Sequence, residues 1–230
     1  MTADNPRTRR PGARLVKGSW GIAFQERYGL VLGLLLVGYL LSGSGRSPVS
    51  VVFNTIVWAT LLLATLWAPG LPAWLRRMGL AATVVVVVTV FTSIFFDTDT
   101  ASGARHLVLA VAQFSALLAI LFRISRHSLV TLQTVMGGVA AYALIAFVMA
   151  AVYHGLDLLI EGPFLNGVTS PGDYTYFSFV TLTTVGYGDL TAATDLAKRL
   201  VVVEAFVGQV FIITLVARLV SLWAPRTREG

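Results

Sequence analysis

The residues best suited to chemistry in this sequence lie in one short segment, Thr184-Val185-Gly186-Tyr187-Gly188. Two of them are glycines at alternate positions, and glycine adopts backbone angles that other residues reach only with strain. Such a backbone can aim successive carbonyl oxygens to one side. A ring of these carbonyls, with the Thr184 hydroxyl, can replace the water shell of a desolvated monovalent cation. The expected chemistry is therefore coordination of an ion by Thr184, Val185, Gly186 and Tyr187.

The composition places this polar segment in a membrane protein. The 230-residue chain is 56% hydrophobic and 12% charged, with a mean hydropathy of +0.78, whereas soluble domains are about a quarter charged. It has no cysteine, which excludes disulfides and thiolate metal sites. Six apolar stretches approach the roughly 20 residues that cross a bilayer. They cover about residues 23–41, 49–67, 78–96, 106–122, 129–153 and 196–222.

The basic residues predict the orientation of these spans. If both chain ends share one side, all but four of the 17 lysines and arginines fall on that side, the exceptions being Arg46, Arg105, Lys198 and Arg199. Cytoplasmic segments carry this excess, so we expect a multi-pass protein of the cell membrane with cytoplasmic N and C termini. Basic residues between apolar runs argue against a nucleic-acid partner and favour membrane lipids, with anionic headgroups at the inner segments.

The glycine-rich segment follows an apolar run that is too short to span. Residues 174–183 suit a half-helix that enters the membrane and stops partway, and Asp173 can cap its start. Non-helical backbone at that depth is tolerated only where protein buries it or where it lines a water-filled path. We therefore expect the glycine-rich segment to line such a path, with the negative end of the half-helix favouring a cation there.

The sequence TTVGYGD (Thr183–Asp189), placed after a half-helix and between two spans, resembles the signature of the potassium channel superfamily, in particular its prokaryotic voltage-independent members. The resemblance covers roughly residues 129–222. It implies passive, potassium-selective transport, with K⁺ as the permeant ion, no other cofactor and no enzymatic activity. Because one pore segment cannot enclose an axial path, it also implies a homotetramer in which each chain has three identical partners.

The fold class that follows is an all-α membrane protein. It has six transmembrane helices, with a re-entrant pore helix and filter between helices five and six, and assembles as a tetramer. The expected parts are a basic cytoplasmic segment (1–27), a four-helix membrane domain (28–127), a pore domain (128–223) and a short cytoplasmic tail (224–230). Voltage sensing requires arginines inside span four. The body of that span has none, so we expect the four-helix domain to pack and anchor.

The resemblance also implies residues that support the filter. They are Asp189 and the pore-helix residues Tyr176, Phe177 and Val180. Tyr176 and Phe177 stand where the family usually has two tryptophans. Tyr176 keeps a hydroxyl that could reach Asp189, and Tyr187 can pack against these rings. Val180 replaces a glutamate found in some bacterial members, so no carboxyl pair with Asp189 can form.

The last span carries a candidate hinge and gate. Gly208 stands where simple two-span potassium channels have a hinge glycine, although small-residue helix packing is nearly as good an explanation. The residues Gln209, Ile212, Val216 and Val220 fall on one helical stripe. By resemblance this stripe faces the pore, where the three apolar residues could form a constriction that gates by dewetting. Ordinary helix packing is the alternative.

Glu204 is an acidic residue inside this last span, and ionisable residues there are functional candidates. One interpretation is a protonated or hydrogen-bonded side chain that braces the pore helix through Ser178 or Thr181. The other is a buried pH switch. The three histidines are scattered along the chain, and we expect them at the surface rather than as ligands. They are His106, His127 and His154.

Three other functions stay open. A non-selective cation channel usually has a changed filter, whereas Tyr187 is intact. A potassium transporter built on the same pore unit would carry four pore repeats, and this chain has one. A non-conducting partner subunit would assemble with another channel. The gating stimulus is not readable from the sequence.

Overall fold

The computed structural model describes residues 28–43, 48–66, 71–95, 99–126 and 131–223. The described elements are, in chain order, α2 (Tyr28–Leu41), α3 (Pro48–Leu66), α4 (Ala73–Phe95), α5 (Asp99–Arg126), α6 (Leu132–Asp157), β1 (Leu165–Asn166), α7 (Gly172–Leu182), β2 (Thr191–Ala192) and α8 (Asp195–Trp223). The predicted cytoplasmic segments, residues 1–27 and 224–230, lie outside the described residues, as does His127.

Each of the six predicted spans overlaps one helix, namely α2, α3, α4, α5, α6 and α8, and residues 23–27 of the first span lie outside the described residues. Three described helices contain a stretch long and apolar enough to cross a membrane, at Thr100–Arg126, Leu132–Asp157 and Asp195–Val220. Two further apolar helices, Tyr28–Leu41 and Val52–Leu66, are shorter than a span requires. The structure is therefore predominantly helical, as expected of an all-α membrane protein.

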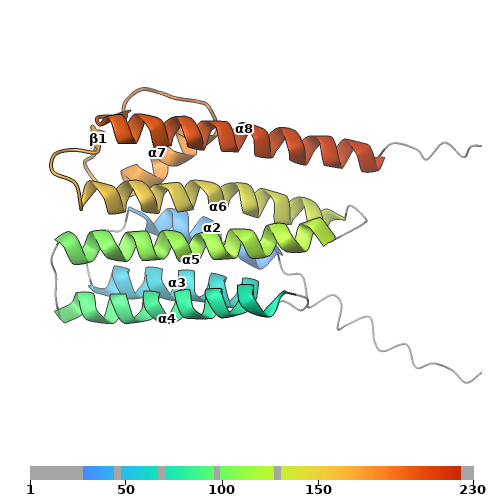
Figure 1. Cartoon of the computed structure of the whole chain (residues 1–230), viewed down its shortest axis with the longest axis horizontal. Helices are drawn as coiled ribbons and strands as arrows, with labels where there is room; N and C mark the ends of the chain where they lie inside the picture. Colours follow the sequence, from blue (N-terminus) through green and yellow to red (C-terminus); the bar gives the residue numbers. More distant parts are fainter. Residues whose placement is uncertain (1–27, 44–47, 67–70, 96–98, 127–130, 224–230) are drawn as a thin grey trace, which may run out of the picture.

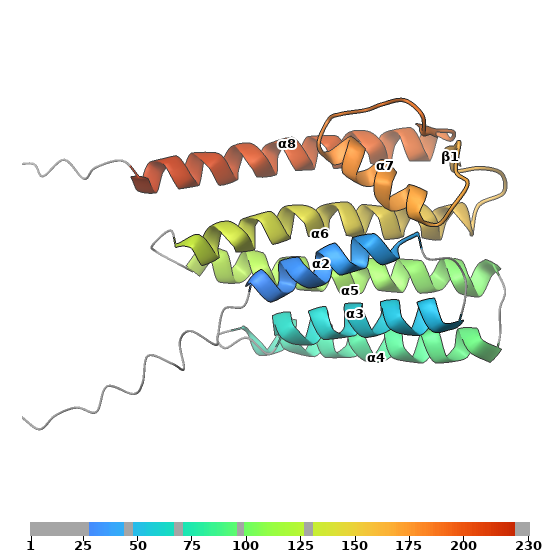
Figure 2. The ribbon, with the colours of Figure 1, turned by 180° about the vertical axis from the view of Figure 1, so that it is seen from behind.

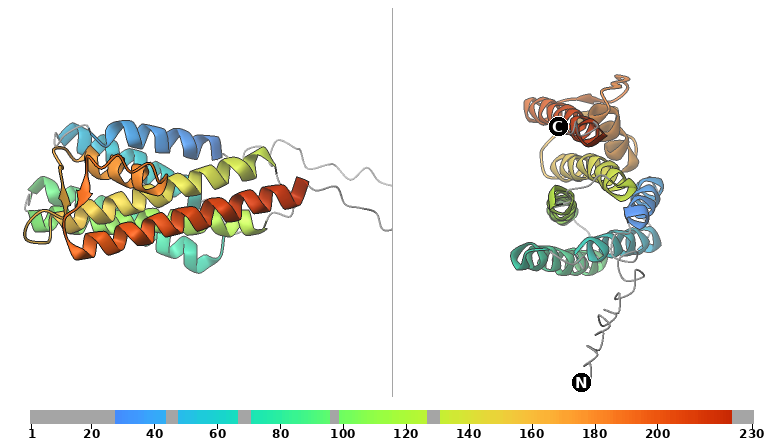
Figure 3. Two further views of the ribbon diagram at one scale, coloured as in Figure 1. Left: turned by 90° about the horizontal axis from the view of Figure 1, so that it is seen from above. Right: turned by 90° about the vertical axis from the view of Figure 1, so that its right-hand side faces the viewer.

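The long helices lie side by side along the long axis of the molecule (Figure 1). Viewed along that axis, α8 and α7 lie on one side, α6 and α5 in the middle, and α3 and α4 on the other side (Figure 3). Buried side chains from six helices form a continuous core, and its members include Leu35 of α2, Leu61 of α3, Ile120 of α5 and Leu144 of α6. The helices that precede the pore region thus pack directly on its first helix, α6.

Two glycines bring α5 and α6 into backbone contact. A Cβ added to Gly103 would lie 3.0 Å from the carbonyl oxygen of Gly155, and a Cβ added to Gly155 would lie 3.0 Å from that of Gly103. Small residues allow membrane helices to approach this closely. The contact fixes α5 against α6 near the end of the bundle that carries the pore loop.

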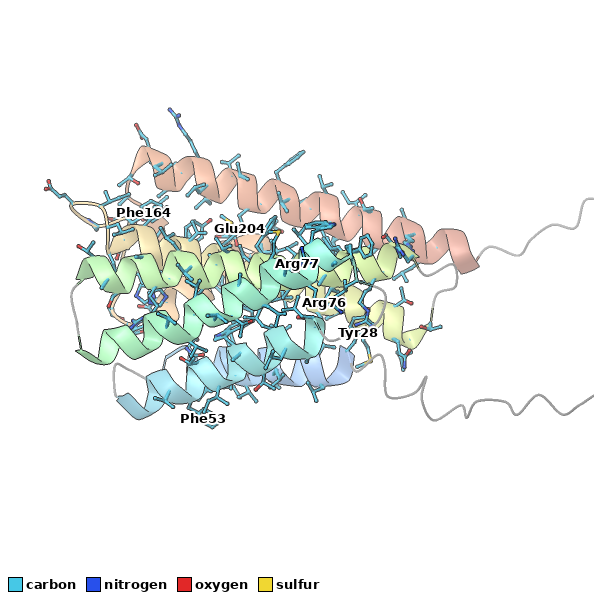
Figure 4. All side chains as sticks on the ribbon, turned by 60° about the horizontal axis from the view of Figure 1, so that its bottom comes forward. Tyr28, Phe53, Arg76, Arg77, Phe164 and Glu204 are labelled. Atoms are coloured by element: carbon cyan, nitrogen blue, oxygen red, sulfur yellow. The ribbon has the colours of Figure 1, made fainter. Side chains whose placement is uncertain are left out.

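Opposite charges lie toward opposite ends of the bundle. Arg76 and Arg77 at the start of α4 lie toward the same end as Tyr28, and Phe164 lies at the other end (Figure 4). The amide of Phe164 donates a hydrogen bond to the carboxylate of Asp157 there. The predicted orientation rests on the distribution of lysines and arginines, and it stays a prediction.

Candidate functional site

The candidate site begins with α7, an 11-residue helix. Figure 2 shows it inclined against α6 and α8 at the end of the bundle where β1 lies. At 1.5 Å per residue its length is about 16 Å, roughly half the hydrocarbon thickness of a bilayer. The predicted half-helix is therefore present, although it begins at Gly172 and ends at Leu182.

The prediction that Asp173 caps this helix is wrong. The capping residue is Pro171, which makes no side-chain cap bond, and Asp173 lies in the first turn. Its carboxylate reaches backwards and accepts hydrogen bonds from the backbone amides of Thr169 at 2.6 Å and Ser170 at 2.9 Å, and from both hydroxyls. Burial acts to raise the pKa of Asp173, but these four bonds outweigh it and hold the pKa below its usual value.

The carboxyl end of α7 is hydrogen-bonded to the first residues of the predicted filter, residues 184–188. The carbonyl oxygen of Val180 accepts hydrogen bonds from the amides of Val185 at 3.0 Å and Gly186 at 3.4 Å. The hydroxyl of Tyr142 on α6 donates to the carbonyl oxygen of Leu182 at 2.9 Å. These carbonyls would otherwise lack partners, because the last turn of a helix has none within the helix. The first filter residues are thus held by the helix that precedes them.

The filter backbone has the left-handed angles expected from its glycines. Gly186 has φ 54° and Gly188 has φ 81°. Thr184 also has a positive φ, 60°, which costs a β-branched residue on the order of 1–3 kcal/mol. Every residue from 183 to 189 is exposed in the single chain, Tyr187 at 71%. Polar, strained and uncovered backbone of this kind indicates a segment built to face a ligand.

Tyr176 makes both contacts predicted for it. Its hydroxyl donates a hydrogen bond to Oδ2 of Asp189 at 2.8 Å, and its ring is stacked with that of Tyr187 at 6.4 Å between centroids. Phe177 faces the other way within the chain, because its ring meets that of Tyr153 on α6 edge-on at 5.6 Å. One aromatic residue therefore supports the filter and the next anchors α7 to α6.

The loop between α6 and α7 also contacts the segment that follows the predicted filter, which the sequence did not indicate. Strands β1 and β2 pair antiparallel, with Leu165 opposite Ala192. Gly167 has φ 87°, and a Cβ on it would lie 2.7 Å from the carbonyl oxygen of Asp189. Glycine is required at this position both for the angle and for the close approach. The loop before α7 thus packs against the segment that leaves the filter.

On the inner helix α8, Gly208 lies against the end of α7. A Cβ added to Gly208 would lie 2.5 Å from Cδ1 of Leu182 and 3.1 Å from its carbonyl oxygen. The small-residue packing considered for Gly208 is therefore observed in this conformation. The stripe formed by Gln209, Ile212, Val216 and Val220 is exposed in the single chain, and no described element of the chain covers it.

Glu204 is almost completely buried, with 1% of its surface exposed, and lies where α8 passes α6 (Figure 4). Its Oε1 forms a hydrogen-bonded contact with the hydroxyl of Ser178 on α7. Its Oε2 accepts a hydrogen bond from the hydroxyl of Tyr153 on α6 at 2.6 Å. Of the two partners predicted for it, Ser178 is confirmed; Tyr153 was not foreseen.

Aromatic contacts connect the first two described helices to α7. Tyr39 of α2 and Phe147 of α6 both meet Phe179 of α7 edge-on, at 5.5 and 5.4 Å between centroids. Trp58 of α3 packs on Phe147 at 4.9 Å. Edge-to-face pairs at this spacing are favourable beyond their burial. The early helices thus contribute to the packing behind the filter.

Two of the scattered histidines meet at the outer end of this packing. The ring of His154 is stacked on His106 of α5 at 3.8 Å and on Tyr174 of α7 at 4.3 Å. The hydroxyl of Tyr174 in turn donates a hydrogen bond to Asp157. Both imidazoles are half-buried, which differs from the surface location expected from the sequence. Among the described residues, no group of three or more His, Cys, Asp or Glu could hold a metal ion.

A short helix that ends in a strained, glycine-rich segment, with a long apolar helix on either side, is an arrangement that ion channel pores use. Residues 138–224 match the model of a protein family described as ion channel. The matched part covers most of α6 and the whole of α7 and α8, and it is similar there to ion channels, which supports the resemblance to the potassium channel superfamily. No curated protein and no solved structure matches the sequence significantly.

Proposed function

We propose that the protein is a potassium-selective channel that carries K⁺ passively through a homotetrameric pore, with Thr184–Gly188 as its selectivity filter. The observation that carries this proposal is the segment itself: a TVGYG sequence with positive φ at Gly186 and Gly188, held by the carboxyl end of α7 and by Tyr176. Potassium channels place four such loops around one axis, and their carbonyls replace the hydration shell of the ion.

The uncovered surface of the pore region supports assembly of several copies. In the apolar stretch of α8 only 11% of the residues are buried, against 56% in that of α6. Lipid can cover apolar side chains such as Val202 and Phe206, which are both 68% exposed. It cannot cover the polar backbone of residues 184–188, because unsatisfied backbone groups do not face lipid. Neighbouring copies can cover both, and four copies close the ring.

The channel does not depend on a voltage sensor. Between Arg105 and Arg123 the sequence of α5 has no charged residue. The membrane potential therefore exerts no force on gating charges in this segment. Opening is assigned instead to α8, with Ile212, Val216 and Val220 as the constriction. The carbonyl oxygen of Ile124 in α5 accepts a hydrogen bond from Arg218 at 2.8 Å, which links that end of α8 to the earlier helices.

The protein is assigned to the cell membrane, with both termini in the cytoplasm. The exposed Arg76 and Arg77 at the start of α4 then lie at the inner surface. Arginines at this surface are attracted to anionic lipid headgroups. Anionic lipid is therefore the expected lipid partner of this end of the bundle.

Uptake of ions by liposomes that contain the purified protein tests the proposal against its rivals. A selective channel takes up rubidium, a potassium analogue, into potassium-loaded liposomes, because the outward potassium gradient drives its entry, and it excludes sodium. Equal uptake of both ions would identify a non-selective cation channel. Uptake of neither by a correctly assembled tetramer would identify a partner subunit. Liposomes without protein provide the background.

A further inference from the structure

Three helices of the pore region meet at one buried carboxyl group. Glu204 of α8, Ser178 of α7 and Tyr153 of α6 are all at most 1% exposed. The hydroxyl of Tyr153 donates a hydrogen bond to Oε2 of Glu204 at 2.6 Å, and the hydroxyl oxygen of Ser178 contacts Oε1. The same hydroxyl oxygen of Ser178 lies 2.7 Å from the carbonyl oxygen of Ala146 in α6.

The protons in this network can be counted. A serine hydroxyl has one proton to donate, and a backbone carbonyl can only accept. The hydroxyl of Ser178 must therefore donate its hydrogen bond to the carbonyl oxygen of Ala146, since two oxygens at that distance without a proton between them would repel. No proton of Ser178 is then left for its contact with Glu204. That contact needs a proton from the carboxyl group, which means that Glu204 is a neutral carboxylic acid.

The charges around Glu204 agree with this count. Among the described residues, the ionisable side chains that face it are Tyr153 and Tyr142, both on α6. The nearest basic side chains on α8 itself, Lys198 and Arg199, are exposed toward its first turn, and Lys198 forms an ion pair with Asp195 at 3.5 Å. A buried carboxylate without a cationic partner is costly, whereas a protonated one with two hydrogen bonds is not.

We propose that Glu204, held as a neutral acid, is a positioning residue for the selectivity filter. It donates to Ser178 and accepts from Tyr153, and so fixes α7 between the inner and the outer helix. The carbonyl of Val180, two residues after Ser178, receives the amides of Val185 and Gly186. A shift of α7 is thereby passed to the filter backbone. The filter role rests on the proposed function; the protonation state does not.

Ionisation of Glu204 would disturb this arrangement. Without its proton, Oε1 and the hydroxyl oxygen of Ser178 would both be acceptors, and one contact of α7 would become repulsive. We therefore expect alkaline conditions that remove the proton to loosen α7. The consequence is reduced potassium selectivity, followed by reduced flux.

Four variants in the full-length protein separate the possible roles. Glu204→Gln offers an N–H donor and a C=O acceptor and so copies the neutral acid, whereas Glu204→Ala removes both groups. Tyr153→Phe removes one donor but keeps the ring packed on Phe177. Ser178→Ala removes the hydroxyl that accepts the hydrogen bond of Glu204. The potassium-to-sodium permeability ratio, measured from neutral to alkaline pH, is the functional readout.

We expect Glu204→Gln to keep the wild-type ratio at neutral pH and to lose the alkaline sensitivity of the wild type. The ratio of Glu204→Ala should fall roughly tenfold, the effect of leaving buried polar groups unpaired. The permeability ratio of Ser178→Ala should also fall, and that of Tyr153→Phe should fall less. If the permeability ratio of Glu204→Gln falls as far as that of Glu204→Ala, Glu204 acts as an anion and the proposal is wrong. A wild-type ratio in Glu204→Ala would equally remove the positioning role.

Infrared spectroscopy tests the protonation state without any ion flux. The wild type should show the carbonyl stretch of a protonated carboxylic acid, and the difference spectrum against Glu204→Gln should contain that band. Its absence at neutral pH would overturn the proposal even if the channel conducts. If the band is present and Glu204→Ala has a lower thermal stability, neutral Glu204 stabilises the packing of α7 even if the protein does not conduct. Size-exclusion chromatography identifies variants that fail to assemble.

Discussion

The hydroxyl of Tyr176 lies 2.8 Å from Oδ2 of Asp189 and donates a hydrogen bond to it. This bond joins the first half of the pore helix α7 to the residue that follows the filter. The rings of Tyr176 and Tyr187 are parallel to within 3°, so the same residue supports the filter from the side as well. With Phe177 turned toward α6, Tyr176 is the aromatic pore-helix residue that contacts the filter within the described chain.

Removal of the Tyr176 hydroxyl alone should make the conducting conformation of the filter less stable. We expect Tyr176→Phe to keep the stacked ring but to shorten the period of sustained potassium current several-fold, because Asp189 loses the donor that restrains it. Recordings of current decay in planar bilayers measure this effect. Tyr39→Phe is the control, since its ring also packs on α7 but outside the filter. If the decay in Tyr176→Phe matches that of the wild type, the hydrogen bond does not stabilise the conducting filter.

A carboxyl group introduced behind the filter should make the potassium current inactivate faster. Val180 cannot pair with Asp189, so we expect slow inactivation that depends on such a pair to be weak in the wild type. In Val180→Glu the current should decay faster than in the wild type. Val180→Gln is the control for the added volume, because glutamine has nearly the same size as glutamate but carries no charge. Unchanged decay in Val180→Glu would remove this explanation.

The contact between Gly208 and Leu182 predicts the cost of adding a methyl group. Gly208→Ala should lower the free energy of unfolding by about 1–3 kcal/mol per subunit, the usual range for overpacking a close contact, as measured by thermal or denaturant unfolding. Gly33→Ala is the matched control, because a Cβ on Gly33 meets no atom within 4 Å. Combination with Leu182→Ala should restore part of the loss. If Gly208→Ala alters gating and Leu182→Ala gives no relief, Gly208 acts as a hinge.

The carboxylate of Asp173 predicts a dependence of stability on acid. Because its pKa in the folded protein lies below the ordinary value of 3.8, its bonds contribute stability above pH 3.8, and this contribution is lost as the pH falls through the lower folded value. Asp173→Asn should therefore be less stable than the wild type at neutral pH. The difference in melting temperature between the two proteins should shrink below pH 3.8. A difference that is constant from neutral to strongly acid pH would contradict this role.

Local patterns in the sequence predicted the local parts of the site. The alternate glycines implied positive φ at Gly186 and Gly188, and the short apolar run implied a half-helix, which the structure places within two residues of the expected start. The bond from Tyr176 to Asp189 was foreseen from the family resemblance, in which both residues support the filter.

Contacts between distant elements could not be predicted in the same way. Tyr153 and Glu204 are 51 positions apart, and neither residue indicates the other without knowledge of how α6 and α8 pack. The stack of His106 on His154 likewise depends on the close approach of α5 and α6. Asp173 was misjudged because an aspartate before a helix usually accepts from the turn that follows it, whereas here it accepts from the residues before it.

The measurement that tests the central claim most directly is the reversal potential of single channels in planar bilayers with potassium on one side and sodium on the other. A filter formed by four copies of Thr184–Gly188 predicts a reversal potential strongly displaced toward the equilibrium potential of potassium. A reversal potential near zero, which means equal permeability to the two ions, would contradict the account.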